Sequence, residues 1–226
     1  MARELFGRIA PRYDLANRVL SGCLDVWWRR VAASEVAPAP GERILDLCTG
    51  TGDLALELER ASGHQAAVFG ADFSTPMLAL AREKHEKAGR VARMTAADGM
   101  ALPYRDGVFD AVTASFGVRS FADLTLGVRE MARVTRPGGR VAILEFTTPE
   151  PGLFRQLYLF YLQRVLPFIG DTLSASPGTY AYLPCTVVEF PSQPELARLM
   201  ADCGLRNVRY RNLTFGVAAL HLGTRT

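Results

Sequence analysis

Short apolar runs recur along the chain and alternate with longer segments in which apolar residues follow helical spacing. The runs predict seven β-strands, at 43–46, 66–71, 91–96, 109–115, 139–146, 208–213 and 217–222. The helical spacing predicts helices at 15–20, 24–36, 54–61, 76–87, 123–134 and 195–203. The pair Pro137-Gly138 is a turn signal before the fifth strand. This alternation indicates an α/β fold with a doubly wound, mainly parallel sheet and helices on both faces.

Two segments stand outside the alternating pattern. Residues 1–40 precede the first strand and predict either a helical lid over a cofactor or a flap over a sheet edge. Residues 150–190 form an insertion after the fifth strand, with aromatic residues at roughly helical spacing that suit a core, an apolar substrate or a membrane surface. Two arginines and two glutamines interrupt this insertion, so it is too polar and too short to span a bilayer. We expect residues 1–226 to form a single domain.

A tight glycine turn follows the first predicted strand. The strand ends in Asp46, and Gly50 and Gly52 lie between it and the next helix. Glycine lets a cofactor approach the backbone where a β-carbon would collide. The third glycine of the dinucleotide-binding fingerprint is missing, and a carboxylate beside a pyrophosphate is electrostatically unfavourable. S-adenosylmethionine has a sulfonium, an ammonium and no phosphate, so the turn favours it over NAD.

Acidic residues also follow the next two strands. Asp72 lies twenty positions after Gly52, where a carboxylate can accept hydrogen bonds from ribose hydroxyls. Asp98 and Gly99 follow the third strand and can meet an adenine ring through a carboxylate and a backbone amide. Surface solvation is the commoner explanation for any single acid. Three acids that end three successive strands nevertheless predict one binding site.

Composition and charge narrow the class of protein. The 226 residues are 49% hydrophobic, and the net charge of +3 comes from scattered arginines without a basic block. Nucleic-acid binding is therefore not indicated. Four widely spaced cysteines, with no C-x-x-C pair, read as reduced thiols in a cytosolic protein and predict no metal site.

The segment after the fourth strand lies where a transferred group is expected. It lacks the Asn/Asp-Pro-Pro-Tyr arrangement of amino-methylating enzymes, and Arg119 can stabilise a substrate oxyanion through a charge-assisted hydrogen bond. A surface arginine paired with an acid is the equally ordinary alternative. Pro184-Cys185 resembles the nucleophile of pyrimidine-methylating enzymes but falls after the wrong strand. His221 lies in the last strand and is predicted to be structural.

Several motifs together resemble the ubiquinone/menaquinone biosynthesis C-methyltransferase family, over nearly the whole chain. They are Tyr13-Asp14-x-x-Asn17 with Ser21 and Trp28, Ser115-Phe116-Gly117-Val118-Arg119, Arg133-Val134-x-x-Pro137-Gly138-Gly139 continuing to Glu145, and the segment 212–223. The glycine turn itself is shared by class I methyltransferases generally and is less specific.

The resemblance implies a class I Rossmann-like fold and methyl transfer from S-adenosylmethionine to a ring carbon of a polyprenylated quinol. The expected substrate is 2-demethylmenaquinol, and the alternatives are C-methylation in ubiquinone biosynthesis or of another small aromatic acceptor. It implies substrate-side roles for Arg119, Tyr13 and Asp14. By position, the resemblance implies cofactor contacts at Thr51, Asp72, Asp98, Gly99 and Ser115. Together with Asp46, Gly50 and Gly52 of the glycine turn and with Phe73, these make nine predicted cofactor residues.

Two departures from the family pattern leave the general base open. Ser120 stands where the family often has asparagine, and Asp25 where it often has histidine. An NAD-dependent dehydrogenase and a non-catalytic cofactor-binding protein are the alternatives from other classes. We expect a cytoplasmic protein whose partner is the prenylated quinol, with a peripheral contact at the inner face of the membrane and no nucleic acid. Whether it forms a homodimer stays open.

Overall fold

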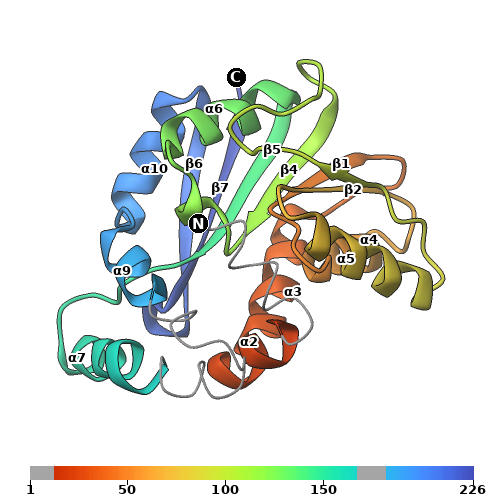
Figure 1. Ribbon diagram of the computed structural model, residues 1–226. Helices are drawn as coiled ribbons and strands as arrows, with labels where there is room; N and C mark the ends of the chain where they lie inside the picture. Colours follow the sequence, from red (N-terminus) through yellow and green to blue (C-terminus); the bar gives the residue numbers. More distant parts are fainter. Residues whose placement is uncertain (1–12, 167–181) are drawn as a thin grey trace.

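The strands form one seven-stranded sheet in a computed structural model that describes residues 13–166 and 182–226 (Figure 1). Their order is β3-β2-β1-β4-β5-β7-β6, and β7 alone runs antiparallel, to both of its neighbours. The strands are β1 (Arg43–Leu47), β2 (Ala67–Asp72), β3 (Met94–Ala96), β4 (Phe109–Ser115), β5 (Thr135–Phe146), β6 (Leu205–Leu213) and β7 (Ala218–Arg225). The predicted doubly wound, mainly parallel sheet is confirmed.

Helices cover both faces of the sheet (Figure 1). One apolar core joins α3 and α4 to the sheet, and a second core joins α6 and α10 to the opposite face. The described helices are α2 (Tyr13–Ser21), α3 (Leu24–Val36), α4 (Asp53–Ala61), α5 (Thr75–Lys87), α6 (Leu124–Val134), α7 (Leu153–Phe160), α9 (Tyr182–Glu189) and α10 (Gln193–Asp202), with short turns η2 (Val118–Ser120), η3 (Tyr161–Val165) and η4 (Thr214–Gly216).

Local chemistry explains where several elements differ from the predicted bounds. A capping box between Ser192 and Glu195 starts α10 two residues before the predicted helix, since each residue satisfies an orphan donor of the other's backbone. β3 is three residues shorter than predicted because Val91 is exposed and only 94–96 pair with β2. Pro137 and Gly138 lie inside β5, opposite a register shift in β4, and a bulge is where a strand tolerates proline. The ladder passes from Thr135 to Arg140 over one residue of β4, and Gly138 has a φ of +76°, so the predicted turn signal marks an irregularity within β5 and not the start of the strand.

The predicted N-terminal lid divides into two parts, and residues 1–12 lie outside the described chain. α3 belongs to the core: the Trp28 ring is 1% exposed, packs on Phe116 and Phe146, and donates through Nε1 to Thr214 Oγ1 at 2.9 Å. Amphipathic α2 lies outside this core, so a lid role stays a proposal for α2 alone.

The insertion after β5 contains α7, η3 and α9, and residues 167–181 within it lie outside the described chain. Cys185 is exposed on α9. His221 is fully buried in β7, with Nε2 3.0 Å from the Gln193 carbonyl oxygen, as expected of a structural histidine. In the part of the chain that the structure describes, no helix has the length and apolar character needed to cross a membrane.

Candidate active site

The sheet changes direction between β1 and β4. The chain runs from β1 through β2 to β3, then returns to the other side of β1 as β4. Ligands of such sheets bind in the crevice outside the carboxyl ends of the strands at this switch point. A cavity of about 430 Å³ lies there, and a smaller cavity shares Cys48, Asp72, Phe73, Gly117 and Ser120 with it. The larger volume is in the usual range for small-molecule and cofactor sites.

Six of the nine predicted cofactor residues line these cavities. Asp72, Phe73, Asp98 and Gly99 line the larger one, and Gly50 and Ser115 line the smaller one together with Asp72 and Phe73. They come from the ends of β1, β2, β3 and β4, which the sheet brings to one edge. Asp46, Thr51 and Gly52 do not line either cavity.

Asp72 holds the glycine turn and the start of α5 at once. Its Oδ2 accepts from the Gly50 amide at 2.9 Å, and its Oδ1 accepts from the Ser74 amide at 2.8 Å. Burial raises the pKa of Asp72, and the backbone amides of Ser74, Gly50 and Phe73 offset part of that rise. The carboxylate therefore has a fixed orientation at the wall of both cavities.

The glycines of the turn are required for different reasons. Gly50 has a φ of +54°, and a β-carbon built on it would meet no atom within 4 Å, so its backbone is open to the crevice. A β-carbon on Gly52 would lie 2.8 Å from His85 Cε1, and one on Gly99 would lie 2.5 Å from the Phe121 ring. Gly50 thus leaves room for the close cofactor approach that was predicted, whereas Gly52 is required by packing against α5.

Two non-glycine residues at the crevice have left-handed backbone conformations. Cys48 follows β1 with a φ of +55°, and Phe116 follows β4 with a φ of +56°. Such conformations cost about 1 kcal/mol or more and concentrate at functional sites. Gly117 leaves room for the Cys48 side chain, which a β-carbon there would overlap. Sequence patterns gave no sign of Cys48.

Asp46 lies beneath the glycine turn, outside the lining of both cavities. Its carboxylate is fully buried and accepts from Thr49 Oγ1 at 2.7 Å and from Thr113 Oγ1 at 3.0 Å. Burial raises the pKa of Asp46 to about 7, against the lowering effects of Thr49, Thr113 and Arg29. These contacts favour an indirect role for Asp46, in which its charge attracts a cationic cofactor and its hydrogen bonds position the glycine turn. The expected role was a direct contact between Asp46 and the cofactor.

The raised pKa of Asp46 predicts a pH dependence of cofactor binding. A carboxyl whose folded-state pKa lies above its ordinary value of 3.8 contributes stability at low pH that is lost as the pH rises towards 7. A bound cation favours the carboxylate, so binding releases protons near neutral pH. We expect the affinity for S-adenosylmethionine to rise by up to about tenfold between about pH 6 and about pH 8.

Titration calorimetry in buffers of different ionisation enthalpy measures this proton release. The Asp46→Asn variant keeps the shape of the side chain and removes the titration, so its binding enthalpy should not depend on the buffer. Equal proton release in Asp46→Asn and in the unaltered protein would contradict the assignment.

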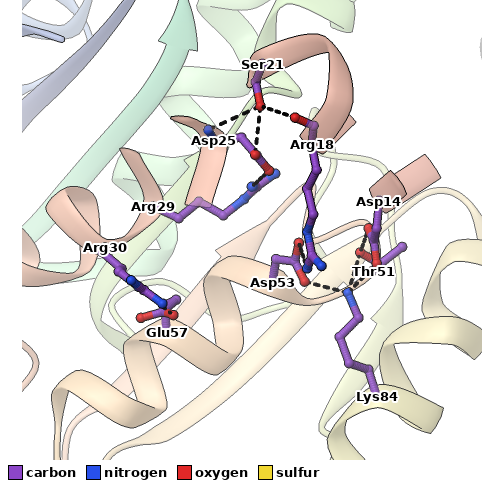
Figure 2. Close-up of polar contacts among 10 residues, drawn as sticks. All are labelled: Asp14, Arg18, Ser21, Asp25, Arg29, Arg30, Thr51, Asp53, Glu57 and Lys84. Carbon is purple, nitrogen blue, oxygen red and sulfur yellow. Dashed lines mark hydrogen bonds and ion pairs between the residues drawn. The ribbon is translucent and has the colours of Figure 1, made fainter. Parts of the chain in front are cut away.

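Hydrogen bonds and ion pairs among four side chains hold α2 against the glycine turn (Figure 2). Lys84 Nζ on α5 donates to Asp14 Oδ2 at 2.7 Å, to Thr51 Oγ1 at 3.0 Å and to Asp53 Oδ1. Thr51 Oγ1 in turn donates to Asp14 Oδ1 at 2.6 Å. We call Asp14, Thr51, Asp53 and Lys84 the α2 clasp.

The contacts of the α2 clasp lower the pKa of Asp14. Burial by itself would raise the pKa of Asp14, but hydrogen bonds from Lys84 and Thr51 and the charges of Lys84 and Arg18 outweigh it, and the pKa is lowered. A carboxylate held in this way is a weak base at neutral pH. The contacts favour a role for Asp14 in positioning α2, in place of the expected proton relay.

Replacing Lys84 by methionine is expected to release α2. The substitution keeps much of the side-chain length and leaves the carboxylates of Asp14 and Asp53 without their shared cation, so amide hydrogen exchange within α2 should accelerate about tenfold. The melting temperature should change little, because these ion pairs are partly exposed. Lys87→Met is the matched control, since Lys87 lies on the same helix and pairs with Glu83 at 2.6 Å on the solvent side. Unchanged exchange in Lys84→Met would contradict the clasp.

Arg119 lies in η2, between two cavity-lining residues, Gly117 and Ser120. Its Nη1 donates to Oε1 of Glu145 at the end of β5, and its guanidinium carbon lies 5.2 Å from the Phe146 ring centre. The two charged side chains are 5% and 0% exposed. Burial raises the pKa of Glu145, and Arg119 offsets part of that rise. The expected cation is thus present beside the crevice, but as half of a buried ion pair.

The structure adds residues that sequence reasoning missed. Met77 from α5 and Cys48 line the smaller cavity, and Lys84 closes the α2 clasp. The helical spacing placed Met77 and Lys84 on a helix, but it did not show that this helix borders the crevice. The side chain of Tyr13 lies outside what the structure describes, so its predicted substrate-side role stays a proposal.

The residues of the crevice suit a cationic cofactor. Among the described residues that line the two cavities, the charged side chains are the carboxylates of Asp72 and Asp98. An ammonium and a sulfonium are attracted by this arrangement, whereas a pyrophosphate is repelled. Within the described ranges, no group of three or more potential metal-ligating side chains is found.

The model of the ubiE/COQ5 methyltransferase family matches residues 1–225. The chain belongs to this family. A demethylmenaquinone methyltransferase of Thermus thermophilus is 53% identical over 98% of this chain and 100% of its own length. A protein of Deinococcus radiodurans with the same name is 49% identical, over 99% and 92%. A ubiquinone/menaquinone biosynthesis C-methyltransferase of Geobacter sulfurreducens is 47% identical, over 99% and 88%.

Solved structures confirm the fold. A methyltransferase of Thermotoga maritima, described as S-adenosylmethionine-dependent, superposes with a TM-score of 0.71 over the whole of both chains, at 17% identity. One from Aquifex aeolicus gives 0.63 at 19% identity, over 88% of this chain and 89% of its own. At these identities the likeness shows a methyltransferase-type Rossmann fold, and family membership shows that the protein is a methyltransferase.

Proposed function

We propose that the protein transfers a methyl group from S-adenosylmethionine to a ring carbon of a polyprenylated quinol, with 2-demethylmenaquinol as the preferred acceptor. The observation that carries this proposal is the acid-lined crevice at the switch point, in a chain that belongs to the ubiE/COQ5 family. Two relatives near 50% identity are named demethylmenaquinone methyltransferases, which supports the naphthoquinol acceptor.

The reaction divides between cofactor, acceptor and protein. When bound, S-adenosylmethionine supplies an electrophilic methyl group. The quinol must lose a hydroxyl proton, which places negative charge on the adjacent ring carbon. This carbon would bond to the methyl group as the methyl–sulfur bond breaks, with the neutral thioether as the leaving group. Loss of the proton on that carbon then restores the aromatic ring, and the oxygen regains a proton. The protein orients the two reactants and stabilises the phenolate; orientation alone can be worth about 7–11 kcal/mol.

The described residues suggest how these tasks are divided. Asp72 would accept from the ribose hydroxyls, Asp98 and Gly99 would meet the adenine ring, and Ser115 would lie near the methionine part. Arg119, oriented by Glu145, would donate to the quinol oxygen and stabilise its negative charge. Tyr13 is the proposed relay of the hydroxyl proton, and the α2 clasp would position it.

Incubation with methyl-labelled S-adenosylmethionine tests the proposal. Reduced demethylmenaquinone and a benzoquinol lacking the methyl group are offered separately, and the label is followed into the organic phase. We expect label in the naphthoquinol. Label in both would extend the activity to ubiquinone-type acceptors, as the name of the Geobacter sulfurreducens relative suggests. Tight cofactor binding without label in either acceptor would contradict the proposal.

A further inference from the structure

The helix after β5 presents apolar side chains on two faces. Tyr158 on α7, with Leu162 and Leu166 beyond it, packs inward against Leu20, Phe146 and Val217. On the outer side, Leu153, Leu157 and Phe160 recur at i, i+4 and i+7 and are 73%, 59% and 63% exposed. A water-exposed helix normally carries polar residues on its outer face, and one that is apolar on both sides is covered by something.

The turn η4 adds a further aromatic residue to this surface. Phe215 in η4 has a φ of +55°, and its side chain is 82% exposed. Its ring meets that of Phe154 at 5.2 Å, edge to face, so two segments distant in sequence form one surface. Trp28 Nε1 donates to Thr214 Oγ1, and Thr147 Oγ1 donates to the Gly216 carbonyl at 2.7 Å, which fixes the turn on both sides. We call Leu153, Phe154, Leu157, Phe160 and Phe215 the α7 patch.

The charge around the α7 patch points to its partner. Residues 151–166 contain two arginines, Arg155 and Arg164, and no acidic residue. Arg164 is exposed, four positions after Phe160. Apolar side chains flanked by arginines are the composition of helices that lie in the surface of an anionic bilayer. Figure 1 shows α7 at the periphery of the molecule, at the same end as α2.

We propose that the α7 patch docks on the surface of an anionic phospholipid bilayer. The inference rests on the proposed function, because a polyprenylated acceptor is dissolved in lipid. The inner face of α7 packs against Phe146, which follows Glu145 of the ion pair with Arg119. Docking at this helix would let the quinol ring enter the crevice while its tail stays in the bilayer.

Flotation with lipid vesicles tests the docking. The unaltered protein should float with vesicles of phosphatidylcholine and phosphatidylglycerol, bind less at high salt, and bind weakly to phosphatidylcholine alone. Leu157→Gln/Phe160→Gln should lower the vesicle partition coefficient by about tenfold for each side chain changed, because each side chain buries apolar area in the lipid. Val91→Gln is the matched control, since Val91 is 64% exposed on the segment before β3, outside the patch. Equal flotation of the double variant and the control would overturn the proposal.

A second variant guards against a folding defect. Phe215→Asn removes the exposed ring and keeps a residue that tolerates a positive φ, so the turn should persist while flotation falls about tenfold.

All variants should still methylate a short-chain quinol in solution, which separates docking from the proposed function. If the unaltered protein floats with vesicles but does not methylate this quinol, the proposed function is contradicted and the docking proposal is not. A lipid-free dimer that the double variant dissociates, with flotation unchanged, would assign the patch to a second copy of the chain and overturn the membrane proposal.

Discussion

Replacing Glu145 by leucine is expected to lower the free energy of unfolding by about 3–5 kcal/mol, because it leaves the Arg119 guanidinium buried without its carboxylate. The same change should abolish methyl transfer, since Arg119 loses the group that orients it. Urea denaturation followed by fluorescence measures the first effect, and turnover with labelled cofactor measures the second. The amide of Phe146, which donates to Glu145 Oε1 at 2.8 Å, also loses its acceptor and adds to the destabilisation.

A double variant separates stability from chemistry. Arg119→Met/Glu145→Leu replaces both charges with apolar side chains and should recover most of the lost stability, while turnover stays abolished if Arg119 donates to the substrate. Glu42→Leu is the matched control: it breaks a pair with Arg140 whose side chains are 13% and 30% exposed, and it should cost less than about 1 kcal/mol. Full turnover in the double variant would contradict the catalytic role of Arg119.

Replacing Asp72 by asparagine is expected to weaken S-adenosylmethionine binding by about 100-fold or more, because each hydrogen bond to a charged group contributes about 1.5–3 kcal/mol. Two effects act together. The ribose loses its anionic acceptor, and the Gly50 or Ser74 amide loses one of the oxygens that fix the glycine turn. Titration calorimetry measures the dissociation constant directly.

The chain offers a matched control for this substitution. Asp110 lies near the amino end of β4, away from the carboxyl ends of the strands at the crevice. It accepts from the Arg43 amide at 2.8 Å, much as Asp72 accepts from the Gly50 amide. Asp110→Asn should leave the dissociation constant unchanged. An unchanged constant in Asp72→Asn, with the protein folded, would remove Asp72 from the cofactor site.

Sequence reasoning succeeded where the signal is local. Alternating apolar runs predicted the parallel sheet, and a parallel sheet brings the ends of its strands to one edge. The order of the residues along the chain was therefore enough to place Asp72 and Asp98 at one crevice. The pair Pro137-Gly138 marks an irregularity inside β5 and not the start of the strand, because β5 begins at Thr135 and pairs with β4 on both sides of this pair.

Long-range contacts could not be predicted in this way. Lys84 meets Asp14 across seventy positions, and Arg119 meets Glu145 across twenty-six, and no periodicity along the chain encodes such pairs. Gly52 showed the same limit: the motif suggested space for a cofactor, whereas the packing of His85 on α5 requires the glycine. The buried position of Asp46 likewise depends on Thr113 from β4.

The position of the transferred methyl group tests the central claim most directly. The protein is incubated with carbon-13 methyl-labelled S-adenosylmethionine and reduced demethylmenaquinone, and the product is examined by nuclear magnetic resonance. The account predicts a labelled methyl attached to the ring carbon beside the hydroxyl, with no label on oxygen. A labelled methyl ether, or an unlabelled quinol recovered from protein that binds the cofactor, would contradict it.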